Sequence, residues 1–319
     1  MAAETNYVIL GTGQLGLAIM DELLARGAAG SLTLVNRSGR VGETLPAGVQ
    51  LATGDMNDPA VVARLCADAD VVFMCAQPPY DKWPELWPPL MQAVLEGLAQ
   101  TQARLVFGDN LYMYGPSGGR PIREDMPYAA TGRKGKTRAQ VAEMVLAAHR
   151  AGRVPAVIGR ASDFYGPRVT DSAFGDRFFD AALAGKPADL VGNLDMPHTY
   201  TFIRDFARGL VTLSAEESAY GQAWHVPSAP TLTTRAFVDL VAAAIGQPVR
   251  PRPAGRLLLT VIGLFQPMVR EIKEMLYEWE EPHVVDHSRF AEVFGAQTTP
   301  HAEAIAETVA WYRARTPAS

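Results

Sequence analysis

The sequence predicts an α/β fold in which a doubly wound parallel sheet is joined to a smaller, interleaved C-terminal region. Over the first half of the 319 residues, short apolar runs alternate with stretches of helical periodicity. A glycine-rich turn follows the first apolar run, as where a strand leads into a helix. After Gly166-Pro167 the alternation becomes irregular, which indicates a second, less regular part of the chain.

The expected strands are short runs of apolar and β-branched residues. In the first half they lie at residues 7–10, 31–35, 49–52, 71–75, 105–107 and 154–159. The run 71–75 is apolar throughout, which is typical of a strand buried on both faces of a parallel sheet. Residues 199–203 and 223–226 look like strands that return from the C-terminal half.

Helices are expected between and after these strands, from apolar periodicity and stop signals such as Gly27. They cover residues 15–26, 59–67, 90–100, 137–150, 174–184, 233–245 and 302–314. Residues 77–89 are rich in Pro and Trp, so an irregular loop is expected there. We therefore expect a sheet domain at residues 1–166, completed by returning segments at about 199–230. Residues 167–198 and 231–319 would form the smaller C-terminal region.

Composition and charge narrow the class of protein. A formal net charge of -5 argues against nucleic acid as a partner, because phosphate binding needs a basic face. The longest apolar run, residues 257–265, is far shorter than the span of about 20 residues that crosses a bilayer, so no membrane partner is expected. Residues 1–6 are few and polar, and no secretory leader is expected. Cys66 and Cys75 lie in apolar context and predict no disulfide framework.

The glycine-rich turn has a pattern that binds the pyrophosphate of a dinucleotide. It reads Gly11-Thr12-Gly13-Gln14-Leu15-Gly16 and lies between an expected strand and an expected helix. Gly11 permits the tight turn, Gly13 lets the backbone approach the pyrophosphate, and Gly16 allows the helix to pack closely on the strand. The free N–H groups of the helix N-terminus would hold the phosphates. The six residues are therefore candidates for cofactor binding in a Rossmann-type domain; the alternative is a purely structural turn.

The end of the second strand indicates which dinucleotide is bound. In NAD-binding domains an Asp or Glu about 20 residues beyond the glycines accepts hydrogen bonds from the ribose hydroxyls. Here Asn36 stands at this place and Arg37 follows it. No carboxylate would repel a 2′-phosphate, and Arg37 could pair with one. We predict NADP as the cofactor, with NAD as the alternative; the competing interpretation of Arg37 is a solvated loop residue.

Two further segments are expected at the cofactor. Asp55 follows the third strand and could accept a hydrogen bond from the adenine amino group, with Met56 beside it. A helix N-cap is the competing role, but Asp58 before Pro59 suits that role better. Cys75-Ala76-Gln77 ends the fourth strand at the switch point of the sheet, where it should pass close to the cofactor.

Together these segments resemble the extended and atypical short-chain dehydrogenases/reductases, a group that includes nucleotide-sugar epimerases, dehydratases and many ketone reductases. Further segments extend the resemblance over most of the chain. They are residues 54–56, 72–76, 113–116, 160–167, 200–205 and 224–226. The resemblance implies a Rossmann-type fold, a nicotinamide cofactor and a substrate held by the C-terminal region.

The segment that should carry the catalytic pair departs from the pattern of this group. The resemblance places a Ser or Thr at Asn110, and a Tyr-x-x-x-Lys pair at Gly135 and Ala139 when Glu143 is the anchor. Neither Gly135 nor Ala139 can donate a proton. Asn110 can still donate a hydrogen bond to a carbonyl. The chain is therefore predicted to lack the usual proton relay.

Replacement groups lie nearby in the sequence. We expect Asn110 to polarise the carbonyl, and Tyr128 with Lys136, or water, to supply the proton. A cation close to a phenol lowers the pKa of the phenol and makes it a useful acid–base group. The competing interpretation is that Tyr128 only packs in a loop. The basic cluster Arg133-Lys134-Lys136-Arg138 indicates either a bound anion or a solvated basic face.

The substrate side of the pattern is also altered. Sugar-nucleotide enzymes of this group typically hold the diphosphate with an Arg, and His198 stands at the matching position. Trp83 and Tyr165, together with His198, are the residues that we expect at the substrate. Their character favours a moderately apolar carbonyl compound over a nucleotide sugar.

Three functions are compatible with the sequence. The first is an NADP-dependent oxidoreductase that transfers a hydride to or from a small, moderately apolar carbonyl or alcohol. The second is a non-catalytic NADP-binding sensor or regulator. The third is an epimerase or dehydratase, which ranks last because such reactions depend on the missing Tyr.

We expect a cytoplasmic protein with a small-molecule substrate; a homodimer is left open. No metal site is predicted, because His283 and His287 lie in a segment that favours a strand.

Overall fold

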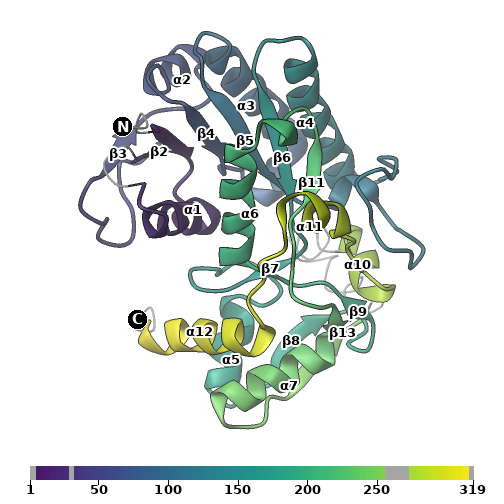
Figure 1. Cartoon of the computed structure of the whole chain (residues 1–319). Helices are drawn as coiled ribbons and strands as arrows, with labels where there is room; N and C mark the ends of the chain where they lie inside the picture. The colour runs from purple at the N-terminus through teal and green to yellow at the C-terminus, as the bar shows by residue number, and fades with distance from the viewer. Residues whose placement is uncertain (1–4, 29–31, 256–272, 316–319) are drawn as a thin grey trace. The chain divides into compact units, whose positions relative to one another are not determined.

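The computed structural model of the chain describes residues 5–28, 32–255 and 273–315 (Figure 1). The chain divides into two compact units. The first comprises Met1–Met113, Arg133–Arg160 and Phe206–Val226, and the second Tyr114–Gly132, Ala161–Asp205 and Pro227–Ser319. The apolar run at residues 257–265 lies outside the described residues. Within the described ranges, no helix is long and apolar enough to cross a membrane.

A seven-stranded parallel sheet forms the centre of the first unit and confirms the predicted fold class. Its strands are β1 (Tyr7–Leu10), β2 (Leu32–Asn36), β3 (Val49–Thr53), β4 (Val71–Met74), β5 (Arg104–Asp109), β6 (Ala156–Arg160) and β11 (Ala223–His225). Their spatial order is β3-β2-β1-β4-β5-β6-β11, and every pairing is parallel. The chain order reverses between β1 and β4. Such a reversal is the switch point at which α/β sheets bind ligands beyond the carboxyl ends of the strands.

Helices cover both faces of this sheet, as its parallel crossovers require. They are α1 (Gln14–Ala25), α2 (Pro59–Leu65), α3 (Trp83–Leu98), α4 (Arg133–Arg150) and α6 (Ile203–Ala215, of which residues 206–215 belong to this unit). On one face, alternate strand residues such as Val8 join a buried apolar cluster with Val145 of α4 and the inner sides of α2 and α3. On the other face α1 and α6 come so close that a Cβ on Gly108 would meet Leu15 and Leu210.

Helix α3 begins earlier than its sequence predicts. Residues 77–89 were expected to form an irregular loop, but only a short 3-10 turn (η1, Tyr80–Lys82) precedes the helix, which starts at Trp83. Pro84 lies in the first turn, where its missing N–H costs nothing, whereas Pro88 and Pro89 lie inside the helix. Trp83 and Trp87 are both almost fully buried. Burial of the two indole rings offsets the hydrogen bonds that the internal prolines remove.

Helix α4 also begins earlier, at Arg133 where residue 137 was expected. The extra turn places residues 134 and 138 at i and i+4 on one face of a continuous helix. Lys134 and Arg138 are buried, whereas Lys136 between them is exposed. The basic cluster is therefore divided between the interior of the unit and solvent.

Among its described residues, the second unit contains three two-stranded sheets and several helices. The strand pairs are β7 (Phe164–Tyr165) with β10 (Thr201–Phe202), β8 (Ala188–Val191) with β13 (Pro251–Ala254), and β9 (Pro197–His198) with β12 (Leu232–Thr233). The helices are α5 (Asp176–Leu183), α7 (Thr234–Ile245), α10 (Tyr277–Glu280), α11 (Ser288–Phe294) and α12 (His301–Ala314). Aromatic rings fill the core, with Phe174 stacked on Phe237 at 4.1 Å and Phe179 on Tyr312 at 4.6 Å between ring centroids.

One of the two strands expected to return to the central sheet does not do so. Residues 199–203 contribute only the short strand β10, which pairs with β7 in the second unit. Helix α6 begins directly after it, at Ile203, so the strand is not continued. The other returning segment is confirmed, since β11 pairs with β6 at the edge of the seven-stranded sheet.

Candidate functional site

The glycine loop connects β1 to α1 at the switch point of the sheet. Gly11 has φ +113°, and a Cβ built there would lie 2.6 Å from the backbone nitrogen of Ala76. A Cβ on Gly16 would lie 2.0 Å from the carbonyl oxygen of Gly11. Both positions therefore require glycine for close backbone packing. Gly13, the N-cap of α1, faces open space, with no atom within 4 Å of a built Cβ. A phosphate can reach the free N–H groups of the first turn there.

Asn36 ties the end of β2 to this loop. Its side-chain N–H groups donate to Thr12 Oγ1 at 2.8 Å and to the Arg40 carbonyl oxygen at 2.8 Å. Its side-chain oxygen accepts from the Gly39 backbone nitrogen at 2.7 Å. Asn36 thus holds the turn after β2 in place, and the exposed side chain of Arg37 projects from that turn.

Asp55 is exposed and tied to its own turn. Its carboxylate accepts from the backbone nitrogen of Asn57 at 3.1 Å and from the Asn57 side chain at 2.8 Å. These bonds lower the pKa of Asp55, and the charge of Arg37 adds a smaller effect in the same direction. Asp58, in contrast, caps α2 by accepting from Ala60 N, as expected. The Met56 side chain is buried in the apolar core, so a contact from this residue to a cofactor would come from its backbone.

Arg138 lies at the carboxyl ends of β4 and β5. Its guanidinium group donates from Nη1 to Asp109 Oδ1 at 2.9 Å and from Nη2 to Gln77 Oε1 at 3.4 Å. The indoles of Trp83 and Trp87 lie against it, with ring centroids 4.3 Å and 3.7 Å from Cζ. Its side chain is 6% exposed. Burial lowers the pKa of Arg138 to about 10, so the group remains a cation at neutral pH.

Lys134 lies one helical turn before Arg138 and is also buried. Its Nζ donates to the Tyr80 carbonyl oxygen at 2.8 Å and lies 3.9 Å from the centroid of the Tyr80 ring. Two cations thus contact the aromatic residues of η1 and the start of α3. A buried cation over an aromatic ring is a favourable contact, which accounts for burial of these side chains.

The predicted catalytic residues are found in different environments. Asn110 follows β5, is half-buried and accepts a hydrogen bond from Tyr112 N at 3.2 Å. Lys136 is exposed on α4, and Tyr128, 37% exposed, lies in the second unit with its ring 5.9 Å from that of Tyr114. The catalytic roles of Asn110, Tyr128 and Lys136 stay predictions.

Sequence reasoning did not single out Arg138, Lys134 or Asp109 as individual site residues. A signal was present in the basic cluster, because Lys134 and Arg138 are spaced i,i+4. It was obscured by the expected start of the helix at residue 137, which left Lys134 outside it. Helix α4, on which the resemblance places a Tyr-x-x-x-Lys pair, contains no tyrosine, and its Lys134 and Arg138 are buried.

Comparison with known proteins places the chain in a family. Residues 7–226, from β1 through β11, match the model of the NAD dependent epimerase/dehydratase family. The chain belongs to this family. The predicted resemblance is thereby confirmed, and the cofactor class of the family is NAD. The preference for NADP stays a prediction.

Proteins similar in sequence to this chain include two dTDP-glucose 4,6-dehydratases. The one from Neisseria gonorrhoeae is 26% identical over 132 residues, which cover 41% of this chain and 38% of the relative. The one from Actinoplanes is 25% identical over 197 residues, which cover 61% and 54%. The matches therefore span less than two thirds of either relative.

Solved structures show the same fold over nearly the whole chain. UDP-glucuronic acid 4-epimerase from Bacillus cereus, in complex with UDP-glucuronic acid and NAD, has a TM-score of 0.79 at 17% identity and covers 97% of this chain and 99% of its own. A double mutant of dTDP-glucose 4,6-dehydratase from Streptomyces venezuelae with NAD bound has a TM-score of 0.77 at 18% identity, with 97% of each chain covered. At these identities the likeness is one of fold.

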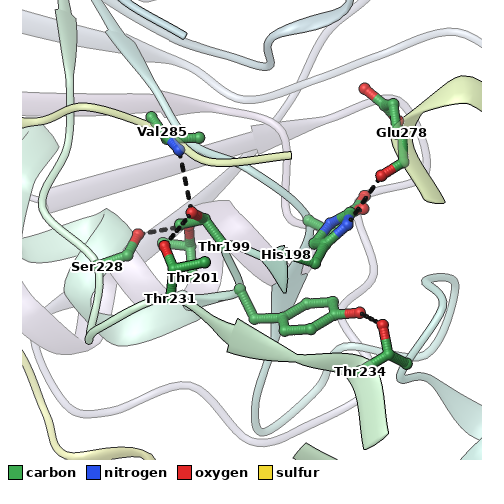
Figure 2. A network of polar contacts seen from close by, with 10 residues as sticks. His198, Thr199, Thr201, Ser228, Thr231, Thr234, Glu278 and Val285 are labelled. Atoms are coloured by element: carbon green, nitrogen blue, oxygen red, sulfur yellow. Dashed lines mark hydrogen bonds and ion pairs between the residues drawn. The ribbon is translucent and has the colours of Figure 1, made fainter. Parts of the chain in front are cut away.

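In this epimerase/dehydratase family member, the second unit encloses His198 in a buried polar network. His198 Nδ1 is 3.1 Å from the Glu278 carbonyl oxygen, beside which it lies in Figure 2, and Nε2 is 2.9 Å from Asp163 Oδ2. A carbonyl only accepts, so Nδ1 carries a proton and donates it. The contact between Nε2 and Asp163 then requires one further proton, on the ring or on the carboxyl group.

Neighbouring groups complete this network. The His198 ring stacks on Tyr200 and His283, with centroids 4.4 Å and 4.8 Å apart. Burial, reinforced by the charge of Asp163, raises the pKa of Glu278, and burial lowers the pKa of His283 to about 3. Among the described residues, Oε2 of Glu278 is buried without a hydrogen-bond partner.

The three residues expected at the substrate are all buried. Trp83 donates from Nε1 to the Pro78 carbonyl oxygen at 3.2 Å. The Tyr165 hydroxyl lies 3.0 Å from His301 Nδ1, and burial raises the pKa of Tyr165. His198 is 1% exposed. Substrate contact by Trp83, Tyr165 and His198 stays a prediction.

Proposed function

We propose that this protein is an NADP-dependent oxidoreductase that transfers a hydride between the nicotinamide ring and a small, moderately apolar carbonyl or alcohol. The observation that carries the proposal is the inner face of α4. This face holds Lys134 and Arg138 beside Asp109, at the end of the sheet where the glycine loop also lies. This arrangement supports hydride transfer with a bound nicotinamide cofactor, in which groups other than a Tyr–Lys pair would exchange the proton.

The geometry after β2 supports NADP. Position 36 carries an Asn, so the ribose-binding carboxylate of NAD-specific domains has no counterpart there. The side chain of Asn36 instead holds the turn after β2 through its hydrogen bonds. Arg37 is exposed at the same turn and can form a charge-assisted hydrogen bond to a 2′-phosphate. The glycine loop would hold the pyrophosphate at the N-terminus of α1.

The reaction would proceed through groups that this chain retains. Bound cofactor supplies or accepts the hydride. Asn110 would donate a hydrogen bond to the substrate oxygen and stabilise the charge that develops on it. Tyr128 with Lys136, or water, would exchange the proton. Loss of a strong general acid lowers the rate of such a reaction by about 10²- to 10⁴-fold and leaves hydride transfer feasible.

An epimerase or dehydratase acting on a nucleotide sugar is the second candidate, and family membership favours it. The relatives and similar structures carry names of this kind. Against it, His198 stands where the resemblance implies a diphosphate-binding Arg, and its ring nitrogens are engaged by Asp163 and Glu278. An engaged, buried imidazole is a poor ligand for a diphosphate.

Titration with NADPH followed by a turnover screen tests the proposal. Cofactor oxidation would be followed at 340 nm with a panel of aldehydes, ketones and quinones, and in parallel UDP- and dTDP-sugars would be incubated with NAD and analysed for new isomers. We expect NADPH oxidation with at least one carbonyl compound. Tight NADPH binding without turnover of any compound would favour a non-catalytic sensor. Conversion of a nucleotide sugar without net cofactor oxidation would establish the second candidate in place of the first.

A further inference from the structure

We infer that Arg138 and Lys134 make this protein bind the reduced form of its nicotinamide cofactor more tightly than the oxidised form. The inference rests on the proposed function only for the binding of a nicotinamide dinucleotide and does not require that a substrate be turned over. Two buried side chains of α4 would thus determine which redox state of the cofactor binds more tightly.

A continuous set of contacts connects Arg138 to the glycine loop within the first unit. Ala76 N donates to the Leu10 carbonyl oxygen at 2.8 Å, and a Cβ on Gly11 would touch this same nitrogen. The next residue, Gln77, accepts from Nη2 of Arg138 at 3.4 Å. A dinucleotide that places its pyrophosphate at the loop extends along the carboxyl ends of β4 and β5 at the switch point. The guanidinium group therefore lies at the nicotinamide end of this site.

Arg138 is held there as a fixed charge. Asp109 contacts its Nη1 at 2.9 Å and also accepts from Nε of Arg160 at 3.4 Å, so two guanidinium groups share this carboxylate. Trp83 and Trp87 lie against the guanidinium group. Nε of Arg138 is buried and has no hydrogen-bond partner among the described residues. A charge that can neither move into water nor lose its proton at neutral pH acts strongly on its surroundings.

Lys134 adds a second cation on the same face of α4. Its Nζ contacts the ring and the carbonyl oxygen of Tyr80, which precedes the tryptophans in the chain. Its Nζ also lies 5.7 Å from the centroid of the Trp83 ring, against which Arg138 lies as well. Both side chains are almost fully buried, so solvent screens them less than it screens the exposed Arg133 and Lys136.

The two redox states of the cofactor differ by one charge at the ring that faces these cations. The oxidised nicotinamide ring is positively charged and the reduced ring is neutral, while the phosphates are the same in both. A nearby buried cation repels the oxidised ring and leaves binding of the reduced ring unaffected. The protein should accordingly release the oxidised cofactor readily, which suits a reductase. A redox-neutral epimerase would need to retain it.

The test is the ratio of the dissociation constants of NADP⁺ and NADPH, measured by calorimetry at pH 7 for the wild-type protein and for Lys134→Met and Arg138→Met. We expect a ratio well above one for wild type and a fall of about ten-fold or more in either variant, as follows from removing one charge a few ångströms away at an effective dielectric constant of about 20. Arg133→Met is the matched control, because Arg133 is an exposed cation on the same helix, paired with Glu85. This control should retain the wild-type ratio.

Arg138→Lys covers the case in which Arg138→Met does not fold because Asp109 is left without its partner. The lysine keeps the charge and should keep most of the ratio. A wild-type ratio of one or below would overturn the inference. An unchanged ratio in Lys134→Met would also overturn it, as would an unchanged ratio in Arg138→Met where that variant folds. Failure to find a carbonyl substrate would count against the proposed function alone. Failure to bind either form of the cofactor would overturn both the inference and the proposed function.

Discussion

At the scale of single residues, the turn after β2 carries an amide, Asn36, where NAD-binding domains place a ribose-binding carboxylate. Asn36 holds the turn through Thr12, Gly39 and Arg40, and Arg37 is left exposed beside it. A neutral amide in this place removes the repulsion that a 2′-phosphate would meet. In the proposed complex with NADP, the exposed guanidinium group of Arg37 would set how strongly the 2′-phosphate is bound.

Arg37→Ala should therefore weaken NADPH far more than NADH. Loss of a charge-assisted hydrogen bond to the 2′-phosphate should raise the dissociation constant for NADPH about ten- to hundred-fold, whereas NADH offers no such group. Titrations of both cofactors by the change in nicotinamide fluorescence would measure the effect. The exposed Arg26, which pairs with Glu22 on α1, provides the control Arg26→Ala. Equal weakening of the two cofactors by Arg37→Ala would refute the assignment of NADP.

At the scale of secondary-structure elements, α3 and α4 depend on each other. Trp83 and Trp87 enter the apolar core from α3 and cover the guanidinium group that α4 supplies. Their burial allows a helix with two internal prolines to form, and the early start of α4 puts Lys134 and Arg138 on its inner face. Loss of one tryptophan should thus affect both packing and the position of the cation.

Trp87→Ala should lower the free energy of unfolding by about 3–5 kcal/mol, the cost of removing a large buried aromatic side chain. Trp87 is 1% exposed and its ring centroid is 3.7 Å from Cζ of Arg138. Leu86→Ala, at a neighbouring position that is 45% exposed, should change stability by about 0.5 kcal/mol or less. Urea unfolding followed by circular dichroism would compare the two. A cost for Trp87→Ala as small as that for Leu86→Ala would contradict the packing described for α3.

At the scale of the whole molecule, the two units differ in the kind of group that they bury. The first unit buries cations next to aromatic rings, and the second buries a network of carboxyl and imidazole groups around His198. The pKa of Glu278 is raised above its ordinary value of 4.5 because burial disfavours its charge. The folded chain therefore binds a proton at Glu278 in a pH range where the unfolded chain has released it. Stability from this group is complete below pH 4.5 and is lost as pH rises toward the folded-state pKa.

Glu278→Gln should remove the loss of stability that the buried Glu278 causes as the pH rises. Between pH 5 and pH 8 the free energy of unfolding of the wild type should fall relative to that of the variant, by up to about 1.4 kcal/mol per pH unit while Glu278 stays protonated in the folded chain. Unfolding by urea at several pH values, with each transition fitted separately, would show the difference. Glu280→Gln, on the exposed side of α10, is the control. Parallel pH profiles for wild type and Glu278→Gln would show that the buried carboxyl group does not control stability.

His283 should act in the opposite direction at lower pH. Burial lowers its pKa from 6.5 to about 3, so the unfolded chain takes up a proton there that the folded chain refuses. Its contribution to stability is present above pH 6.5 and is lost as pH falls toward 3. The two groups together predict that the second unit is most stable in mildly acidic solution.

Most strands and helices of the central sheet, the glycine loop and the nicotinamide class of cofactor could be predicted from the sequence alone. These features depend on local signals: apolar periodicity, glycines at positions that need close backbone approach, and an Asp that caps α2. Gly11, Gly16 and Asp58 could be read in this way because their roles involve neighbours in the chain or a fixed turn geometry.

The groups that fill the interior beside the glycine loop could not be predicted in this way, because they come from segments far apart in the chain. The helical start at Trp83 depends on burial of its ring. The burial of Lys134 and Arg138 depends on aromatic rings, the Asp109 carboxylate and the Gln77 amide, which are 29 to 61 residues away in the chain. The network of His198 likewise joins Asp163 and Glu278, 35 and 80 residues away. The residues next to Arg138 or His198 in the chain do not decide whether the side chain is solvated or buried. The free energy of burying such a polar group depends on hydrogen-bond partners that only the folded chain brings close.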